Sequence, residues 1–182
     1  YPPRTADAAD AVASAGGDAS QAEVELGGLV RLQGRRIPPV GLLAVTVDLS
    51  SSSADGGKAD GKIGSVDAVV DLGSCVTVCN WAAAARVGLM PGDSRLNMGD
   101  QVIAGASGEA VRVSEARIAI SCGGMKARQV AVCIADLPIF GAIGLNGPAM
   151  VLGLDALAPN SAKQKGSRVV LSAAADAVWV EQ

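Results

Sequence analysis

The sequence predicts a mainly β protein, arranged as a small barrel or folded sheet with one or two short helices. Short apolar runs rich in β-branched residues recur at close intervals along the chain. Gly-containing turns separate several of these runs. Only two segments have the pattern of a short helix, so strands do not alternate with helices as they do in a parallel α/β sheet.

The N-terminal segment differs in composition from the rest of the chain. Residues 1 to about 28 are rich in Ala, Asp, Gly and Ser and contain few large apolar side chains. We therefore expect a low-complexity, disordered leader over residues 1–35 and a folded domain over residues 36–182. Because the sequence begins with Tyr1, we expect a fragment or a processed product. The acidic residues of the leader argue against an Arg-rich transit peptide.

The first predicted hairpin pairs residues 42–48 with residues 64–71. The sequence LLAVTVD is apolar and β-branched, and GSVDAVVD returns to the same pattern. Residues 49–62 between them, LSSSSADGGKADGK, read as a long polar loop.

The middle of the chain predicts a short helix followed by three strands. Asn80 is a suitable N-cap and Gly88 a suitable stop for the Ala-rich segment between them. Residues 101–120 read as two strands joined around the sequence GASG. A second hairpin then turns at Gly123–Gly124.

The C-terminal part predicts further strands. Residues 149–159, AMVLGLDALAP, read as an apolar strand that runs into a short helix ending at Pro159. Residues 168–173 read as a strand, and AVWVEQ at residues 177–182 is a candidate for one more.

Composition excludes several classes of partner. The chain is 49% hydrophobic but only 2% aromatic, so aliphatic side chains must fill its core. The formal charge is −3 and no basic block is present, so we expect neither a nucleic acid nor an anionic membrane as partner. No apolar run approaches the roughly 18 residues that span a bilayer. We expect a soluble, intracellular protein, although the sequence does not identify its compartment.

The absence of His restricts the chemistry most strongly. The chain contains 0 His residues, so a Ser–His or Cys–His nucleophile and a His-ligated metal site are excluded within it. Carboxylates are then the natural groups for acid–base catalysis. Three of the four Cys residues lie in apolar runs and are interpreted as buried thiols. Cys75 and Cys79 lack further ligands at metal-binding spacing, so we expect no metal and no cofactor.

Three sequence features occur in a characteristic order. They are VVDLGS at residues 69–74, a Gly-tipped hairpin around residues 105–108, and MVLGLDAL at residues 150–157. Together they resemble the retropepsin-like (retroviral-type) aspartic peptidases, and in particular the single-domain members of plants and algae. The segments NWAAAARVGL and IADLPIFGAIGL add to this likeness. The resemblance covers residues 36 to about 173.

The resemblance implies a closed barrel and an aspartic endopeptidase that needs neither metal nor cofactor. Each subunit of a homodimer would supply one catalytic Asp. The two carboxylates would share a proton, activate a water, and protonate the carbonyl of a polypeptide substrate. The residues that the resemblance assigns are the catalytic Asp71, its loop residues Leu72, Gly73 and Ser74, the flap residues Gly105, Ala106, Ser107 and Gly108, and the supporting residues Gly153 and Asp155.

Leu72 departs from the family pattern. The family has Thr or Ser at this position, whose hydroxyl links the loops of the two subunits, and Leu cannot form that hydrogen bond. A second hypothesis therefore stays open, in which the domain is catalytically impaired and serves as a dimerisation or peptide-binding module. The plainest alternative for Asp71 is an ordinary strand-terminal residue in a turn.

Overall fold

In the computed structural model, the described residues are 28–51, 63–97, 101–104, 108–158 and 167–181. Over these ranges the chain forms a β-rich fold with short helices. Its elements are β1 (Leu29–Ile37), β2 (Leu42–Ser51), β3 (Ile63–Val70), β4 (Val78–Cys79), α1 (Trp81–Arg86), β5 (Val102–Ala104), β6 (Ala110–Arg112), β7 (Ser114–Cys122), β8 (Met125–Ile134), α2 (Pro138–Ala142), β9 (Ala149–Leu152), α3 (Leu154–Leu157), β10 (Val169–Ser172) and β11 (Ala177–Glu181).

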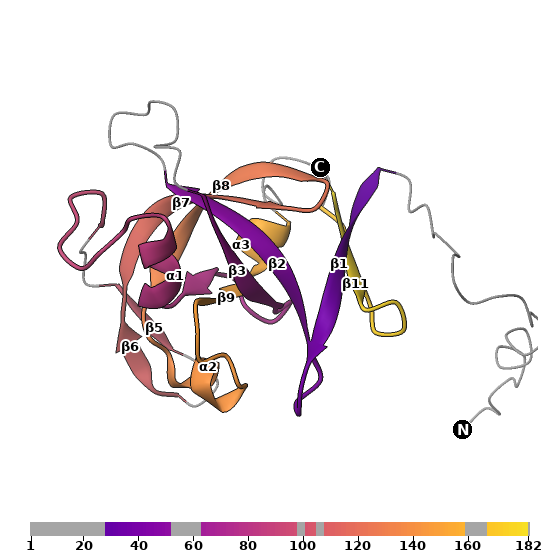
Figure 1. Ribbon diagram of the computed structural model, residues 1–182, viewed down its shortest axis with the longest axis horizontal. Helices are drawn as coiled ribbons and strands as arrows, with labels where there is room; N and C mark the ends of the chain where they lie inside the picture. The colour runs from indigo at the N-terminus through magenta and orange to yellow at the C-terminus, as the bar shows by residue number, and fades with distance from the viewer. Residues whose placement is uncertain (1–27, 52–62, 98–100, 105–107, 159–166, 182) are drawn as a thin grey trace, which may run out of the picture.

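Six strands close into a barrel (Figure 1). Neighbouring strands follow the order β2-β3-β9-β4-β8-β7, and β7 pairs back with β2 to complete the ring. The pairs β3–β9 and β4–β8 are parallel, and the remaining pairs of the ring are antiparallel. The prediction of a mainly β fold with a small closed barrel is confirmed.

Both predicted hairpins of the barrel are confirmed. In the first, β2 and β3 pair from Ala44↔Val69 to Ser50↔Ile63. The second joins β7 and β8 at Gly123–Gly124, and Gly123 has a φ of +51°, a conformation that glycine adopts without strain.

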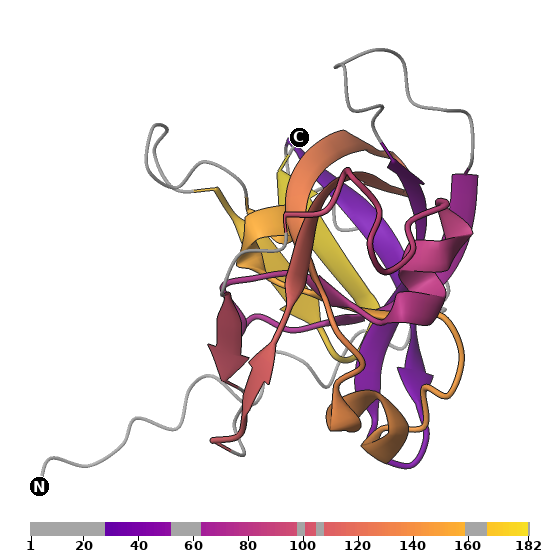
Figure 2. The same cartoon turned by 90° about the vertical axis from the view of Figure 1, so that its left-hand side faces the viewer.

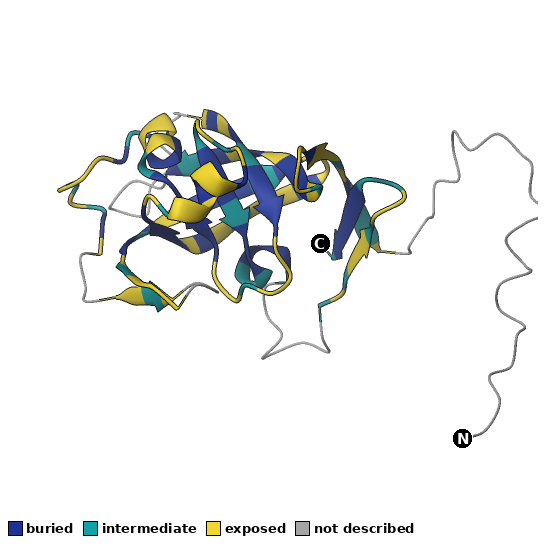
Figure 3. Cartoon of the chain, turned by 90° about the horizontal axis from the view of Figure 1, so that it is seen from below, coloured by how far each residue is buried: buried dark blue, intermediate teal, exposed yellow. Residues whose placement is uncertain are grey.

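Strand alternation places the core inside the barrel. In β2, Val45, Val47 and Leu49 are buried, whereas Thr46 and Asp48 between them are exposed. Figure 3 shows the same contrast between the buried barrel strands and the largely exposed β5–β6 hairpin. The core is formed mainly by Val, Leu, Ile and Ala, as the low aromatic content requires.

The helix α1 begins and ends where the sequence predicts. The side chain of Asn80 accepts a hydrogen bond from the Ala83 N–H at 2.9 Å, and Gly88 has a φ of +76°. The structure also forms α2 at Pro138–Ala142, where no helix is predicted, so the described residues contain three helices rather than one or two. Pro138 favours this start because its ring presets φ for the first helical turn.

The strand β1 covers residues that the sequence analysis assigns to the leader. Its first half pairs with β11 and its second half with β2, so residues 29–35 are strand in the structure. Leu32 and Ile37 are buried, but polar neighbours such as Gln33 and Arg35 weaken the local strand pattern. The partner strand β11 lies far along the chain, and its hydrogen bonds stabilise β1.

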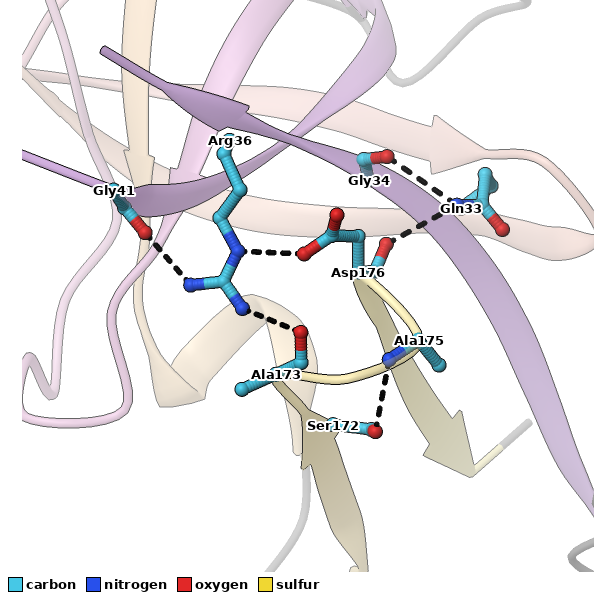
Figure 4. A network of polar contacts seen from close by, with 8 residues as sticks. All are labelled: Gln33, Gly34, Arg36, Gly41, Ser172, Ala173, Ala175 and Asp176. Carbon is cyan, nitrogen blue, oxygen red and sulfur yellow. Dashed lines mark hydrogen bonds and ion pairs between the residues drawn. The ribbon is translucent and has the colours of Figure 1, made fainter. Parts of the chain in front are cut away.

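The strands β1, β10 and β11 form an extension beside the barrel (Figure 1). Figure 4 shows how the guanidinium of Arg36 connects two turns of this extension. It donates to Asp176 Oδ1 at 2.6 Å, to Gly41 O at 2.7 Å and to Ala173 O at 2.8 Å. The β10–β11 turn is thereby attached to the β1–β2 turn within one chain.

Within the part of the chain that the structure describes, no helix is long and apolar enough to cross a membrane.

Candidate active site

The loop that carries Asp71 begins where β3 ends. The Asp71 N–H donates to Leu152 O of β9 at 3.0 Å, which fixes the start of the loop against the neighbouring strand. The carboxylate Oδ1 accepts from the Gly73 N–H at 2.9 Å, and the Ser74 N–H donates to Asp71 O at 3.3 Å. These bonds form a tight turn in which Asp71 remains exposed to solvent.

The next residues of the loop present apolar surface. The Leu72 side chain is 40% exposed and that of Val76 is 39% exposed. The Ser74 hydroxyl donates to Val76 O at 2.7 Å, so it is used within its own loop. Leu72 has no hydroxyl, and the loop therefore presents no side-chain donor next to Asp71 at position 72.

Gly153 lies directly beneath the loop. A Cβ at this position would lie 2.5 Å from Val76 O, closer than real Cβ atoms approach. The adjacent Leu154 N–H donates to Ser74 O at 2.9 Å. The close approach of the two backbones therefore depends on a residue without a side chain.

Asp155 and Thr77 form a second connection between α3 and the loop. The Asp155 carboxylate accepts from the Thr77 N–H at 3.0 Å and from the Thr77 hydroxyl at 2.6 Å. The Thr77 Oγ1 accepts in turn from the Gly153 N–H at 3.1 Å. Sequence reasoning missed Thr77. The available signal was its place in the apolar run VTV, because a buried hydroxyl needs a hydrogen-bond partner.

A groove of about 640 Å³ opens beside Asp71. The hairpin β5–β6 and the helix α2, which lie in the same half of the molecule in Figure 2, both contribute to its wall. Its described lining is mostly apolar, and the two charged residues in it are Asp71 and Glu109. Sequence reasoning missed Glu109 and α2 because no local motif places them near Asp71.

The β5–β6 hairpin is the element that the sequence analysis calls the flap. Ile103 and Val111 lie opposite each other in its register and both line the groove. Gly108 has a φ of +75°, which suits a glycine turn. The other flap residues, Gly105, Ala106 and Ser107, lie outside the described residues.

The thiols differ in exposure. Cys75 is exposed, whereas Cys79, Cys122 and Cys133 are buried. Burial raises the pKa of Cys79 to about 12 and that of Cys122 to about 11, which keeps both as unreactive thiols at neutral pH. Among the described residues, no cluster of three or more His, Cys, Asp or Glu side chains is arranged to hold a metal ion.

Comparisons with known proteins yield a structural likeness. No family model matches the sequence, and no curated protein matches it. Among solved structures, the chain is similar to a retropepsin-like aspartic protease from Rickettsia conorii at 12% identity and a TM-score of 0.44. The match covers 84% of this chain and 90% of that one. At this identity and TM-score, the likeness assigns neither an activity nor site residues to this chain.

Proposed function

We propose that the chain is one subunit of a homodimeric aspartic endopeptidase with Asp71 as its catalytic residue. The observation that carries the proposal is the position of Asp71, whose exposed carboxylate lines an apolar groove. Gly153 and Asp155 hold the loop that presents it. The sequence resemblance of the segments around these residues to the retropepsin-like peptidases supports the same assignment.

The proposed pairing of two chains rests on the family resemblance. Hydrolysis of a peptide bond by carboxylates uses one group as base and another as acid. The resemblance implies one catalytic Asp per chain, so in this proposal the second carboxylate is Asp71 of a second copy. Two such groups at close range share one proton, which supplies a base and an acid at the same pH.

In this mechanism the ionised Asp71 accepts a proton from a water molecule, and the water oxygen bonds to the peptide carbonyl carbon. The protonated Asp71 of the second copy gives its proton to the carbonyl oxygen. The first Asp71 then passes its proton to the nitrogen, the C–N bond breaks, and the amine leaves. The carboxylate of the second copy takes back a proton from a hydroxyl of the tetrahedral intermediate as the new carboxyl group forms. The substrate is an extended polypeptide whose apolar side chains occupy the groove.

The test is cleavage of a mixed peptide pool between pH 3 and pH 7 by the parent and by Asp71→Asn. We expect cleavage by the parent and a loss of at least about 10³-fold in the variant, because Asn cannot exchange a proton. Asn retains the oxygen that accepts from Gly73, so the loop geometry is preserved.

Asp48→Asn is the matched control for this test. It makes the same chemical change at an exposed position of β2, and its oxygen still accepts from the Ser65 hydroxyl. We expect it to retain the parent's activity. Cleavage that survives in Asp71→Asn, or silence of a folded parent across the whole pH range, contradicts the proposal.

A second candidate function is a peptide-binding or dimerisation module without catalysis. Leu72 favours it, because an exposed apolar side chain stands where a hydroxyl would position the paired carboxylates. A folded dimer that binds peptides in the groove but leaves them intact supports this alternative.

A further inference from the structure

We propose that Glu109 is a specificity-determining residue that selects a Lys or Arg side chain in the bound polypeptide. This inference rests on the proposed function, since it concerns the substrate of the same groove. It is independent of the catalytic residue, because Glu109 belongs to the segment that leads into β6 and not to the Asp71 loop.

Strand geometry directs Glu109 towards the groove. Glu109 immediately precedes β6, and both Glu109 and Val111, two residues later, line the groove, as expected of side chains on one face of an extended segment. Val113 is only 4% exposed and Val111 packs beside it in the same hydrophobic cluster. Ile103, directly opposite Val111, extends this face, and Glu109 lies at its outer end and lines the groove.

The Glu109 carboxylate is available to a ligand. It is exposed, and among the described residues it has neither a hydrogen bond nor an ion pair. Arg112 is the next residue after Val111 in the same strand, so it lies on the opposite face. It lines another pocket, together with Trp81 and Asp136. The charged side chains of the described groove lining, Asp71 and Glu109, are therefore both acidic.

A groove of this composition favours a basic side chain with an apolar stem. The methylenes of Lys or Arg pack along Ile103 and Val111 while the cationic head reaches Glu109. An acidic side chain at the same place would meet like charge. Since the proposed dimer is two-fold symmetric, each subunit presents one Glu109, and basic residues are selected on both sides of the cleaved bond.

Binding to the Asp71→Asn variant tests this selection without hydrolysis. The probes are labelled apolar peptides in which one position at a time carries Lys, norleucine or Glu. At one of the substituted positions, we expect the Lys peptide to bind about two- to fivefold more tightly than the norleucine peptide at low salt. The preference shrinks as salt is raised to about 0.5 M, because the pair is solvent-exposed.

Charge variants assign the preference to Glu109. In the Asp71→Asn background, Glu109→Gln abolishes the Lys preference and Glu109→Lys transfers it to the Glu peptide. Asp48→Asn removes one negative charge at a position outside the groove and leaves the Lys preference unchanged. Two results overturn the inference. One is a Lys preference that persists in Glu109→Gln, and the other is the absence of any Lys preference in the Asp71→Asn protein that keeps Glu109.

The outcomes also separate this inference from the proposed function. Cleavage by the parent with no dependence of kcat/KM on Glu109 overturns the role of Glu109 alone. A Glu109-dependent binding preference in a protein that cleaves no peptide supports the role of Glu109 and overturns the peptidase proposal.

Discussion

Leu72 is the residue that most affects catalysis in the proposed peptidase. Its side chain is exposed at the loop surface, and the neighbouring Ser74 hydroxyl is already bonded to Val76 O. A dimer built on this loop therefore lacks the hydroxyl that would join the two copies beside Asp71. Positioning of catalytic groups tolerates small displacements poorly, so this absence is expected to reduce the rate rather than to alter the fold.

Leu72→Thr should raise peptide cleavage by about five- to thirtyfold. The new hydroxyl can form one hydrogen bond per subunit across the dimer, and each contributes on the order of 1 kcal/mol to positioning. Because position 72 is exposed, the free energy of unfolding should change by less than about 0.5 kcal/mol. The measurements are kcat/KM on a cleaved peptide and denaturant unfolding.

Leu72→Val is the matched control, since Val has the shape of Thr without the hydroxyl. It should leave kcat/KM near the parent value. An equal gain in both variants would show that side-chain shape, not hydrogen bonding, limits cleavage by the parent protein. No gain in either, with the dimer intact, would remove Leu72 as the obstacle to activity.

At the scale of elements, the junction of β9 and α3 supports the Asp71 loop. Gly153 permits backbone contact with Val76, and Asp155 receives two hydrogen bonds from Thr77. The element therefore contacts the loop through both backbone and side chain, at positions that are close only after the barrel has closed.

Gly153→Ala should lower the free energy of unfolding by about 1–3 kcal/mol. The added methyl would overlap Val76 O, so the loop or the helix must move. Gly147→Ala is the control, because a Cβ there meets no atom within 4 Å. Urea denaturation of both variants measures the difference. A Gly153→Ala protein as stable as Gly147→Ala would contradict the close packing described for this junction.

At the scale of the whole molecule, Arg128 connects three separate parts of the chain. From β8, its guanidinium donates to Ala156 O at 3.0 Å and Leu157 O at 3.2 Å, at the end of α3. It also donates to Glu181 O in the C-terminal strand β11. The barrel, the last helix and the strand extension thus meet at one side chain.

Arg128→Met should lower the free energy of unfolding by about 2–3 kcal/mol. Met keeps the apolar stem but leaves these carbonyl groups without their charged donor. Arg86→Met, a charge removal at an exposed position of α1, should cost less than about 0.5 kcal/mol. Thermal or urea unfolding distinguishes the two. Equal, small losses in both variants would show that Arg128 does not join these elements energetically.

The ion pair of Asp93 and Arg95 should keep its contribution to stability over most of the proposed assay range. The hydrogen-bonded guanidinium of Arg95 lowers the pKa of Asp93 from 3.8 to about 2. The stabilisation from this pair is therefore complete above its ordinary pKa and is lost only as the pH falls through about 2. The pair remains charged across most of the interval from pH 3 to pH 7.

The sequence by itself determined the features that depend on neighbouring residues. Period-two runs specified the hairpins β2–β3 and β7–β8. Gly123 and Gly124 specified the turn between β7 and β8, and Asn80 specified the start of α1. The local pattern placed Asp71 at the end of a strand, the family resemblance selected it as a candidate, and its catalytic role stays a prediction.

Only the tertiary structure decided the contacts between distant residues. The pairing of β1 with β11, the bond between Thr77 and Asp155, and the place of Glu109 in the groove have no local sequence signal. The reason is physical. A residue's own neighbours bias its backbone, whereas the closing of the barrel and the burial of its apolar faces select which distant segment it meets.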